Sequence, residues 1–102
     1  MRKITAEATM AFINSYNFKK DNTQVIVTDN NVTVYLHGNV IAQRINGVVT
    51  LSHCDWLTNT TKERLNGILS YLNAPKIYQK AFVWYRDIDG KQTEFKHGWN
   101  RV

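Results

Sequence analysis

Apolar residues recur along the chain at two different spacings, which predict helices and strands. Between Thr5 and Tyr16 they lie three or four positions apart, so we expect a helix with one buried face and Thr5 as its cap. From Gln24 to His53 apolar and polar residues alternate, which predicts strands. Turn sequences split this region into a four-strand antiparallel meander. These turns are Asp29-Asn30-Asn31, Gly38-Asn39 and Asn46-Gly47.

A second helix is predicted after the meander. Thr60-Thr61-Lys62-Glu63 is a capping box, in which the Thr60 hydroxyl accepts from the backbone N–H of Glu63 and the Glu63 carboxylate accepts from that of Thr60. Apolar residues follow at helical spacing, and Pro75 prevents the helix from continuing. The apolar stripe consists of Leu65, Ile68, Leu69 and Leu72.

The last quarter of the chain returns to a β pattern. Ile77–Arg86 predicts one strand, and the Asp89-Gly90 turn leads into another around Gln92–Phe95. The whole pattern predicts one α+β domain over residues 1–102. Its single, mostly antiparallel sheet would combine the four-strand meander with a C-terminal hairpin, and two helices would pack on one face.

Composition narrows the class of protein. The chain has 102 residues, of which 43% are hydrophobic, too many for a disordered protein. No apolar run approaches the roughly 20 residues of a membrane span, so no membrane association is expected. The first residues, MRKITAEATMAF, lack the apolar segment of a secretory signal, and the single cysteine fits a reducing compartment. A cytoplasmic protein is therefore expected.

Catalytic and metal-binding motifs are sparse. Cys54 has three histidines and Asp55 as potential partners, but no signature of a cysteine enzyme surrounds it, so a small buried thiol is the preferred interpretation. His53 and Asp55 could converge on a metal, because alternate side chains of a strand share a face, yet no paired metal-ligand spacing is present. We expect no enzyme activity, no metal and no cofactor.

Basic and aromatic residues gather in the last quarter. The net charge is +5, from 13 Lys and Arg against 8 Asp and Glu, and the segment from Lys76 to Val102 holds six basic and three acidic residues. Every second residue of the predicted strand is aromatic or basic: Tyr78, Lys80, Phe82, Trp84 and Arg86. Such a face is typical of a platform for single-stranded nucleic acid, where rings stack on bases and cations neutralise phosphates.

The same strand has a structural explanation. The rings at positions 78, 82 and 84 could form the core under a helix, with Lys80 and Arg86 extending their charges at its edge. The opposite face is also largely apolar, so which face is open stays undecided at this point. The candidate residues for binding nucleic acid or another partner are Tyr78, Lys80, Trp84, Arg86, Lys91, Lys96 and Trp99.

Three stretches resemble a family of small uncharacterised proteins encoded by tailed bacteriophages. They are LHGNVIA at 36–42, TNTTKERLN at 58–66 and IYQKAFVWYRDIDGKQTEF at 77–95. The resemblance covers most of residues 20–95. It implies a phage accessory protein that works in the host cytoplasm, and it carries over no catalytic residues.

Two functions from different classes follow. The first is a non-enzymatic phage accessory protein that binds nucleic acid, or a nucleic-acid complex, through its C-terminal hairpin, with an affinity that falls steeply with salt. The alternative is a protein-directed inhibitor of a host defence system or another host enzyme, anchored by Trp84 or Trp99 beside an arginine. A homodimer that pairs one aromatic face with its copy is compatible with either function.

Overall fold

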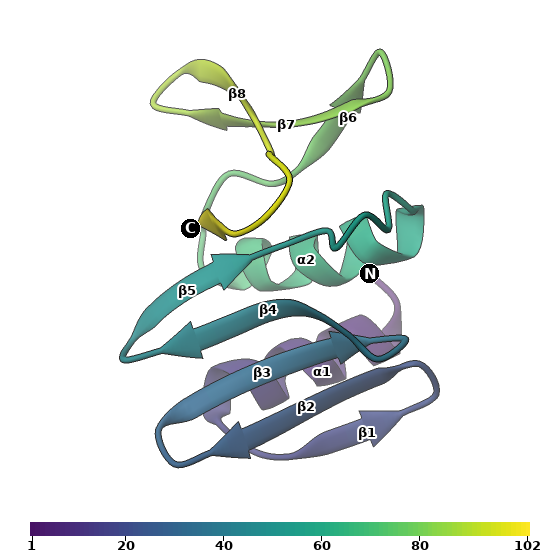
Figure 1. The fold of residues 1–102 in the computed structure, drawn as a ribbon, viewed down its shortest axis with the longest axis vertical. Helices are drawn as coiled ribbons and strands as arrows, with labels where there is room; N and C mark the ends of the chain where they lie inside the picture. Colours follow the sequence, from purple (N-terminus) through teal and green to yellow (C-terminus); the bar gives the residue numbers. More distant parts are fainter.

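The computed structural model describes residues 1–102, which form two helices and two antiparallel sheets (Figure 1). The elements in chain order are α1 (Lys3–Asn14), β1 (Phe18–Lys20), β2 (Thr23–Thr28), β3 (Asn31–Leu36), β4 (Asn39–Ile45), β5 (Val48–Leu51), α2 (Asn59–Tyr71), β6 (Tyr78–Lys80), β7 (Val83–Ile88), β8 (Lys91–Glu94) and β9 (Asn100–Arg101). Sheet A has the order β1-β2-β3-β4-β5-β9, and sheet B the order β6-β7-β8.

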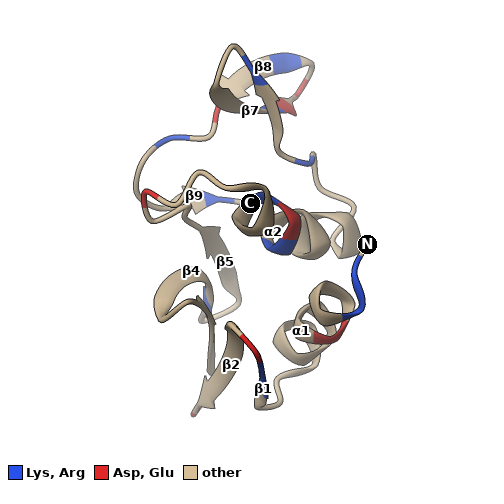
Figure 2. Ribbon diagram, turned by 90° about the vertical axis from the view of Figure 1, so that its right-hand side faces the viewer, with Lys and Arg blue, Asp and Glu red and all other residues tan.

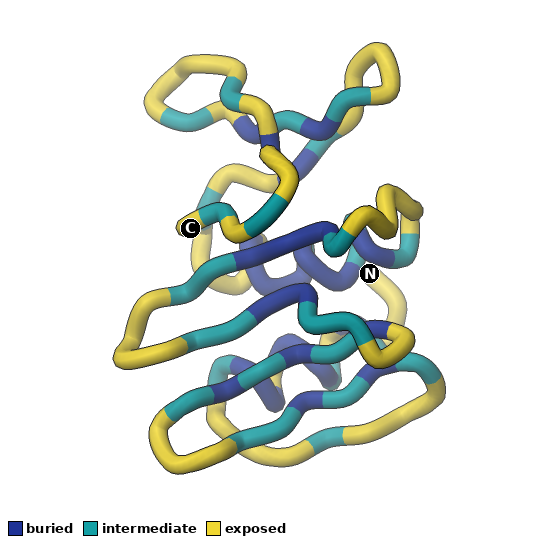
Figure 3. Tube along the Cα trace, in the orientation of Figure 1, coloured by how far each residue is buried: buried dark blue, intermediate teal, exposed yellow.

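Sheet A contains the predicted meander. Strands β2 to β5 pair as consecutive antiparallel neighbours, and β3 alternates buried and half-buried residues as its sequence indicates. Both helices lie on one face of this sheet (Figure 1). The main core is the layer between sheet A and the two helices, where most buried residues lie (Figure 3). The α+β class, the meander and the placement of the helices on one face are confirmed.

The prediction of a single sheet is wrong, because the C-terminal strands form sheet B. Ala81 and Phe82 have φ angles of 51° and 67°, and Lys80 pairs directly with Val83 across them. They therefore form a two-residue hairpin turn of the kind that needs positive φ at both positions. The expected strand Ile77–Arg86 is thus two strands, β6 and β7, and the faces of β7 are exchanged relative to the prediction.

Both helices begin earlier than predicted. Helix α1 begins at Lys3, and Thr5 lies buried within it instead of capping it. Helix α2 begins at Asn59, and its cap is Thr58, whose Oγ1 accepts from the backbone N of Thr61 at 3.2 Å. The predicted capping box at Thr60 is therefore wrong.

Gly67 sets the distance between the helices. A β-carbon at this position would lie 2.6 Å from Thr5 Cγ2 and 2.7 Å from Thr9 Oγ1 on α1. Gly67→Ala is expected to lower the free energy of unfolding by about 1–3 kcal/mol, because the helices must move apart. Urea denaturation measures this change, with Ser70→Ala on the exposed side of α2 as control. An unchanged or raised stability of Gly67→Ala would contradict the close approach.

Candidate functional site

Trp84 is buried and belongs to the core of sheet B. Its side chain is only 2% exposed, and its ring packs edge-on against His53 at 5.8 Å and against Phe95 at 6.2 Å between centroids. The ammonium group of Lys62, on α2, lies 5.6 Å from the centre of the Trp84 ring. A buried ring cannot stack on a base, so the platform prediction is wrong for Trp84 and its interpretation as a core residue is confirmed.

Arg86 is also buried, with 3% exposure. Its Nε donates to the carbonyl of Pro75 at 2.7 Å and its Nη1 to that of Arg101 at 3.5 Å. Burial lowers the pKa of Arg86 below its ordinary value. Arg86 therefore ties β7 to the segment before β6 and to β9, and its predicted role at an exposed binding face is wrong.

Tyr78 and Lys80 lie on the outer face of sheet B. The rings of Tyr78 and Tyr85 face each other across β6 and β7, 6.0 Å apart. The Tyr78 hydroxyl donates to Asp87 Oδ1 at 2.6 Å, and this bond raises the pKa of Tyr78 to about 12. Glu94 lies opposite Tyr85 on β8. The outer face thus combines tyrosines with carboxylates, and Lys80, opposite Val83, is exposed near the turn.

Lys96 and Trp99 meet in a cleft between sheet B and the segment that leads into β9. With Arg101 they line a cavity of about 280 Å³, and Trp99 is 47% exposed. We call this the C-terminal cleft; its other lining residues are Arg86, Ile88, Thr93, Glu94, Phe95 and Asn100. Lys91 is exposed on β8 but does not line it. Figure 2 shows basic residues on β8, on β9 and between them, with acidic positions interspersed.

Asn100 fixes the shape of the C-terminal cleft. Its Nδ2 donates to the carbonyls of Lys96 at 2.8 Å and Gly98 at 3.2 Å, and its Oδ1 accepts from the backbone N of Lys96 at 3.0 Å. This side chain holds residues 96–100 in one tight loop. Lys96, Trp99 and Arg101 are therefore presented together, although sequence reasoning did not include Arg101 among the candidates. The sequence signal for Arg101 was only its positive charge near the other candidates, because Trp99 lies outside the two-residue strand β9.

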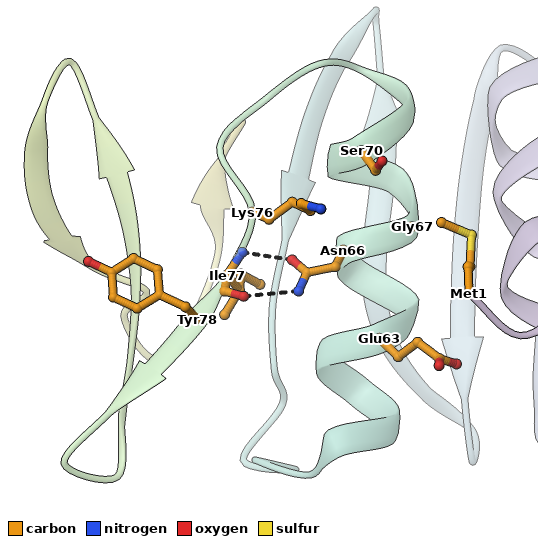
Figure 4. Close-up of a pocket in the computed structure, with 8 residues that line it drawn as sticks. All are labelled: Met1, Glu63, Asn66, Gly67, Ser70, Lys76, Ile77 and Tyr78. Atoms are coloured by element: carbon orange, nitrogen blue, oxygen red, sulfur yellow. Dashed lines mark hydrogen bonds between the residues drawn. The ribbon is translucent and has the colours of Figure 1, made fainter.

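A second, more open groove of about 550 Å³ runs between α2 and the segment that enters β6 (Figure 4). Asn66 bridges it by donating to the carbonyl of Ile77 at 2.9 Å and accepting from its backbone N at 2.7 Å. The last asparagine of the TNTTKERLN stretch thus holds the segment that enters sheet B against α2. The charged side chains in this groove are Glu63 and Lys76, one of each sign.

The residues considered for catalysis have mainly structural partners. Cys54 Sγ donates to the carbonyl of Val40 at 2.6 Å. His53 Nδ1 accepts from the backbone N of Asp55 at 3.0 Å, while the Asp55 carboxylate lies 3.3 Å from His97 Nδ1. No three His, Cys, Asp or Glu side chains are grouped closely enough to hold a metal ion.

His53 is expected to make the stability of the protein depend on pH. Burial lowers the pKa of His53 below 6.5, nearby His97 lowers it further, and Asp55 opposes both effects. As the pH falls, His53 is therefore protonated at a higher pH in the unfolded chain than in the folded protein. The free energy of unfolding should be unaffected by His53 above its unfolded pKa and decrease below it, by at most about 1.4 kcal/mol per pH unit.

Urea denaturation at several pH values between 7.5 and 5 checks this dependence. His53→Gln, which cannot titrate, should remove most of the loss in this range. An identical pH dependence in His53→Gln and the unaltered protein would show that another group is responsible.

Comparisons with known proteins place the chain in a family. Neither helix is long and apolar enough to cross a membrane. Searches among curated proteins and among solved structures find no match. In a comparison with protein families, the Kyanoviridae Gp96 protein matches residues 1–101, almost the whole chain. The resemblance to small phage proteins is thereby confirmed, and the chain belongs to the Kyanoviridae Gp96 protein family.

Proposed function

We propose that this phage protein is a non-enzymatic accessory protein that binds a nucleic-acid strand at the C-terminal cleft. The observation that carries the proposal is the convergence of Lys96, Trp99 and Arg101 on one cavity of about 280 Å³. A half-exposed indole offers a face on which a base can stack, and two exposed cations beside it can neutralise the flanking phosphates.

The charge around the C-terminal cleft fits an anionic strand. Exposed Lys91 lies on the adjacent strand β8 and could contact a phosphate beyond the cleft. Glu94 is the one carboxylate in its lining. The C-terminal cleft is therefore lined by more basic than acidic side chains, beside the exposed indole.

Binding of a fluorescent single-stranded oligonucleotide, measured by anisotropy at several salt concentrations, tests the proposal. Trp99→Ala should weaken binding by about 1–3 kcal/mol, the contribution of one stacked base. Lys96→Ala combined with Arg101→Ala should reduce the salt slope by about 1.4, or roughly 0.7 for each lost phosphate contact. Each variant is first checked for an unchanged circular dichroism spectrum.

Lys19→Ala combined with Lys20→Ala is the matched control, because it removes the same charge from β1, at the opposite edge of sheet A from β9. This control should retain most of the affinity and its salt slope. No binding by the unaltered protein at low salt, or an equal loss in the control and the cleft variant, would refute the proposal.

The outer face of sheet B supports a second candidate, a protein-directed inhibitor of a host factor. At the end of this face away from the β6–β7 turn, the Asp87 and Glu94 carboxylates would repel phosphates, while the paired tyrosines suit a protein surface. Affinity capture from infected cells, with and without nuclease, separates the two candidates. A partner that is retained after nuclease treatment and lost in Tyr85→Ala would favour the inhibitor; Tyr85→Phe serves as a conservative control.

A further inference from the structure

The turn between β6 and β7 has an aromatic ring at a position where three other hairpin turns have glycine. Phe82, at φ 67°, is 91% exposed, more than any other large hydrophobic residue. Three further turns that join paired strands have two residues at positive φ, and in each the second is glycine: His37-Gly38, Asn46-Gly47 and Asp89-Gly90. A bulky residue is disfavoured in this conformation, so Phe82 contributes nothing to folding that glycine would not supply better.

The hairpin that carries this turn packs against the rest of the molecule. Below it, Trp84 is buried against His53 and Phe95. Lys62, on α2, donates to Gln79 Oε1 at 3.3 Å, next to the turn. Figure 3 shows the turn as an exposed end of a hairpin whose base is buried. The Phe82 ring is therefore held out into solvent on a hairpin fixed at its base.

The charge of the hairpin indicates what the ring contacts. Lys80 is the exposed cation nearest the ring, two positions from Phe82, whereas Arg86 is buried. The nearest carboxylate in the hairpin, Asp87, lies at the end of β7 away from the turn and accepts from the Tyr78 hydroxyl. An exposed ring beside a lysine fits a partner in which flat apolar surfaces alternate with negative charges, as bases and phosphates do in nucleic acid.

We infer that Phe82 inserts its ring between two neighbouring bases of the bound strand while Lys80 contacts a phosphate beside them. This inference rests on the proposed function and adds a second contact point to it, at the turn of sheet B outside the C-terminal cleft. Insertion separates two stacked bases, and the ring replaces their contact with each other.

A single-stranded oligonucleotide that carries 2-aminopurine next to guanine tests the insertion, since guanine quenches 2-aminopurine while the two bases are stacked. Binding of the unaltered protein should raise the fluorescence at least twofold. Phe82→Gly should bind about tenfold more weakly, without the rise in fluorescence, because loss of one stacked aromatic ring has an effect of this order. Phe82→Trp should retain both properties.

The variants separate failure of this inference from failure of the proposed function. Phe82→Gly suits the φ of the turn and should be at least as stable to urea as the unaltered protein, so lost binding cannot be assigned to misfolding. Leu57→Ala, an exposed apolar residue elsewhere, is the control and should bind normally.

Binding by Phe82→Gly that equals that of the unaltered protein would overturn the insertion and leave the proposed function intact. Binding of the oligonucleotide without a rise in fluorescence would also overturn the insertion. So would a Phe82→Gly variant that binds the oligonucleotide normally but no longer captures a protein partner that resists nuclease treatment. No binding by the unaltered protein would overturn both proposals.

Discussion

Trp84→Ala is expected to lower the free energy of unfolding by about 3–5 kcal/mol, the usual cost of removing a buried aromatic side chain. The ring is 2% exposed and fills the space between sheet B, His53 and Lys62 of α2. Its loss should therefore loosen sheet B from the rest of the molecule. Urea denaturation measures the stability, and limited proteolysis shows whether residues 78–95 become cleavable first.

Trp99→Ala is the matched control, because the same side chain is removed from an exposed position. Its stability should change by no more than about 0.5 kcal/mol, as for most surface substitutions. If Trp84→Ala remained as stable as Trp99→Ala and lost only nucleic-acid affinity, Trp84 would belong to a binding face after all.

Arg64→Ala should lower the free energy of unfolding by a similar amount, about 3–5 kcal/mol, because it removes a buried charged group that donates three hydrogen bonds, each contributing roughly 1.5–3 kcal/mol. The Arg64 guanidinium is 3% exposed. Its Nη1 donates to Thr5 Oγ1 at 2.6 Å and to Glu63 Oε1 at 2.8 Å, while Nε donates to Thr23 Oγ1 at 3.1 Å. One side chain thus joins α1, α2 and β2. Urea denaturation measures the loss.

Arg2→Ala provides an internal comparison for Arg64→Ala. Arg2 Nε approaches the same Glu63 oxygen at the same distance, 2.8 Å, but its side chain is 56% exposed. Its replacement should cost only about 0–1 kcal/mol, because water screens the pair and solvates whichever group remains. Equal losses of stability in Arg2→Ala and Arg64→Ala would contradict the argument that burial determines the contribution of each arginine. Arg64→Lys should also destabilise, since one ammonium group cannot reach all three acceptors.

The fold was predictable where local chemistry marks the ends of elements. Asn46-Gly47 and Asp89-Gly90 form the turns their sequences favour, and the alternation in β3 gives its buried face correctly. The turn at Ala81-Phe82 has no such marker, because neither residue is typical of positive φ. Strand β9 is only two residues long and pairs with the distant β5, which no local pattern indicates.

The errors in the predicted binding face come from this one unrecognised turn. A two-residue turn in the middle of a supposed strand exchanges the faces beyond it, so Trp84 and Arg86 lie inside while Tyr78 and Lys80 lie outside. Lys96 and Trp99, two of the predicted binding residues, are exposed, and they lie in a loop where strand alternation has no influence. Their convergence with Arg101 depends on the Asn100 hydrogen bonds, which sequence spacing does not show.

The pairing of β9 with β5 has a consequence for the order of folding. Helix α1 and the meander form from contacts between neighbours in the chain, and such contacts form early. Sheet A gains its sixth strand only when Asn100 and Arg101 reach β5, about half the chain length away in sequence. During synthesis, the meander can therefore assemble while residues 78–99 are still being added, and the C-terminal cleft can take shape only as the last step.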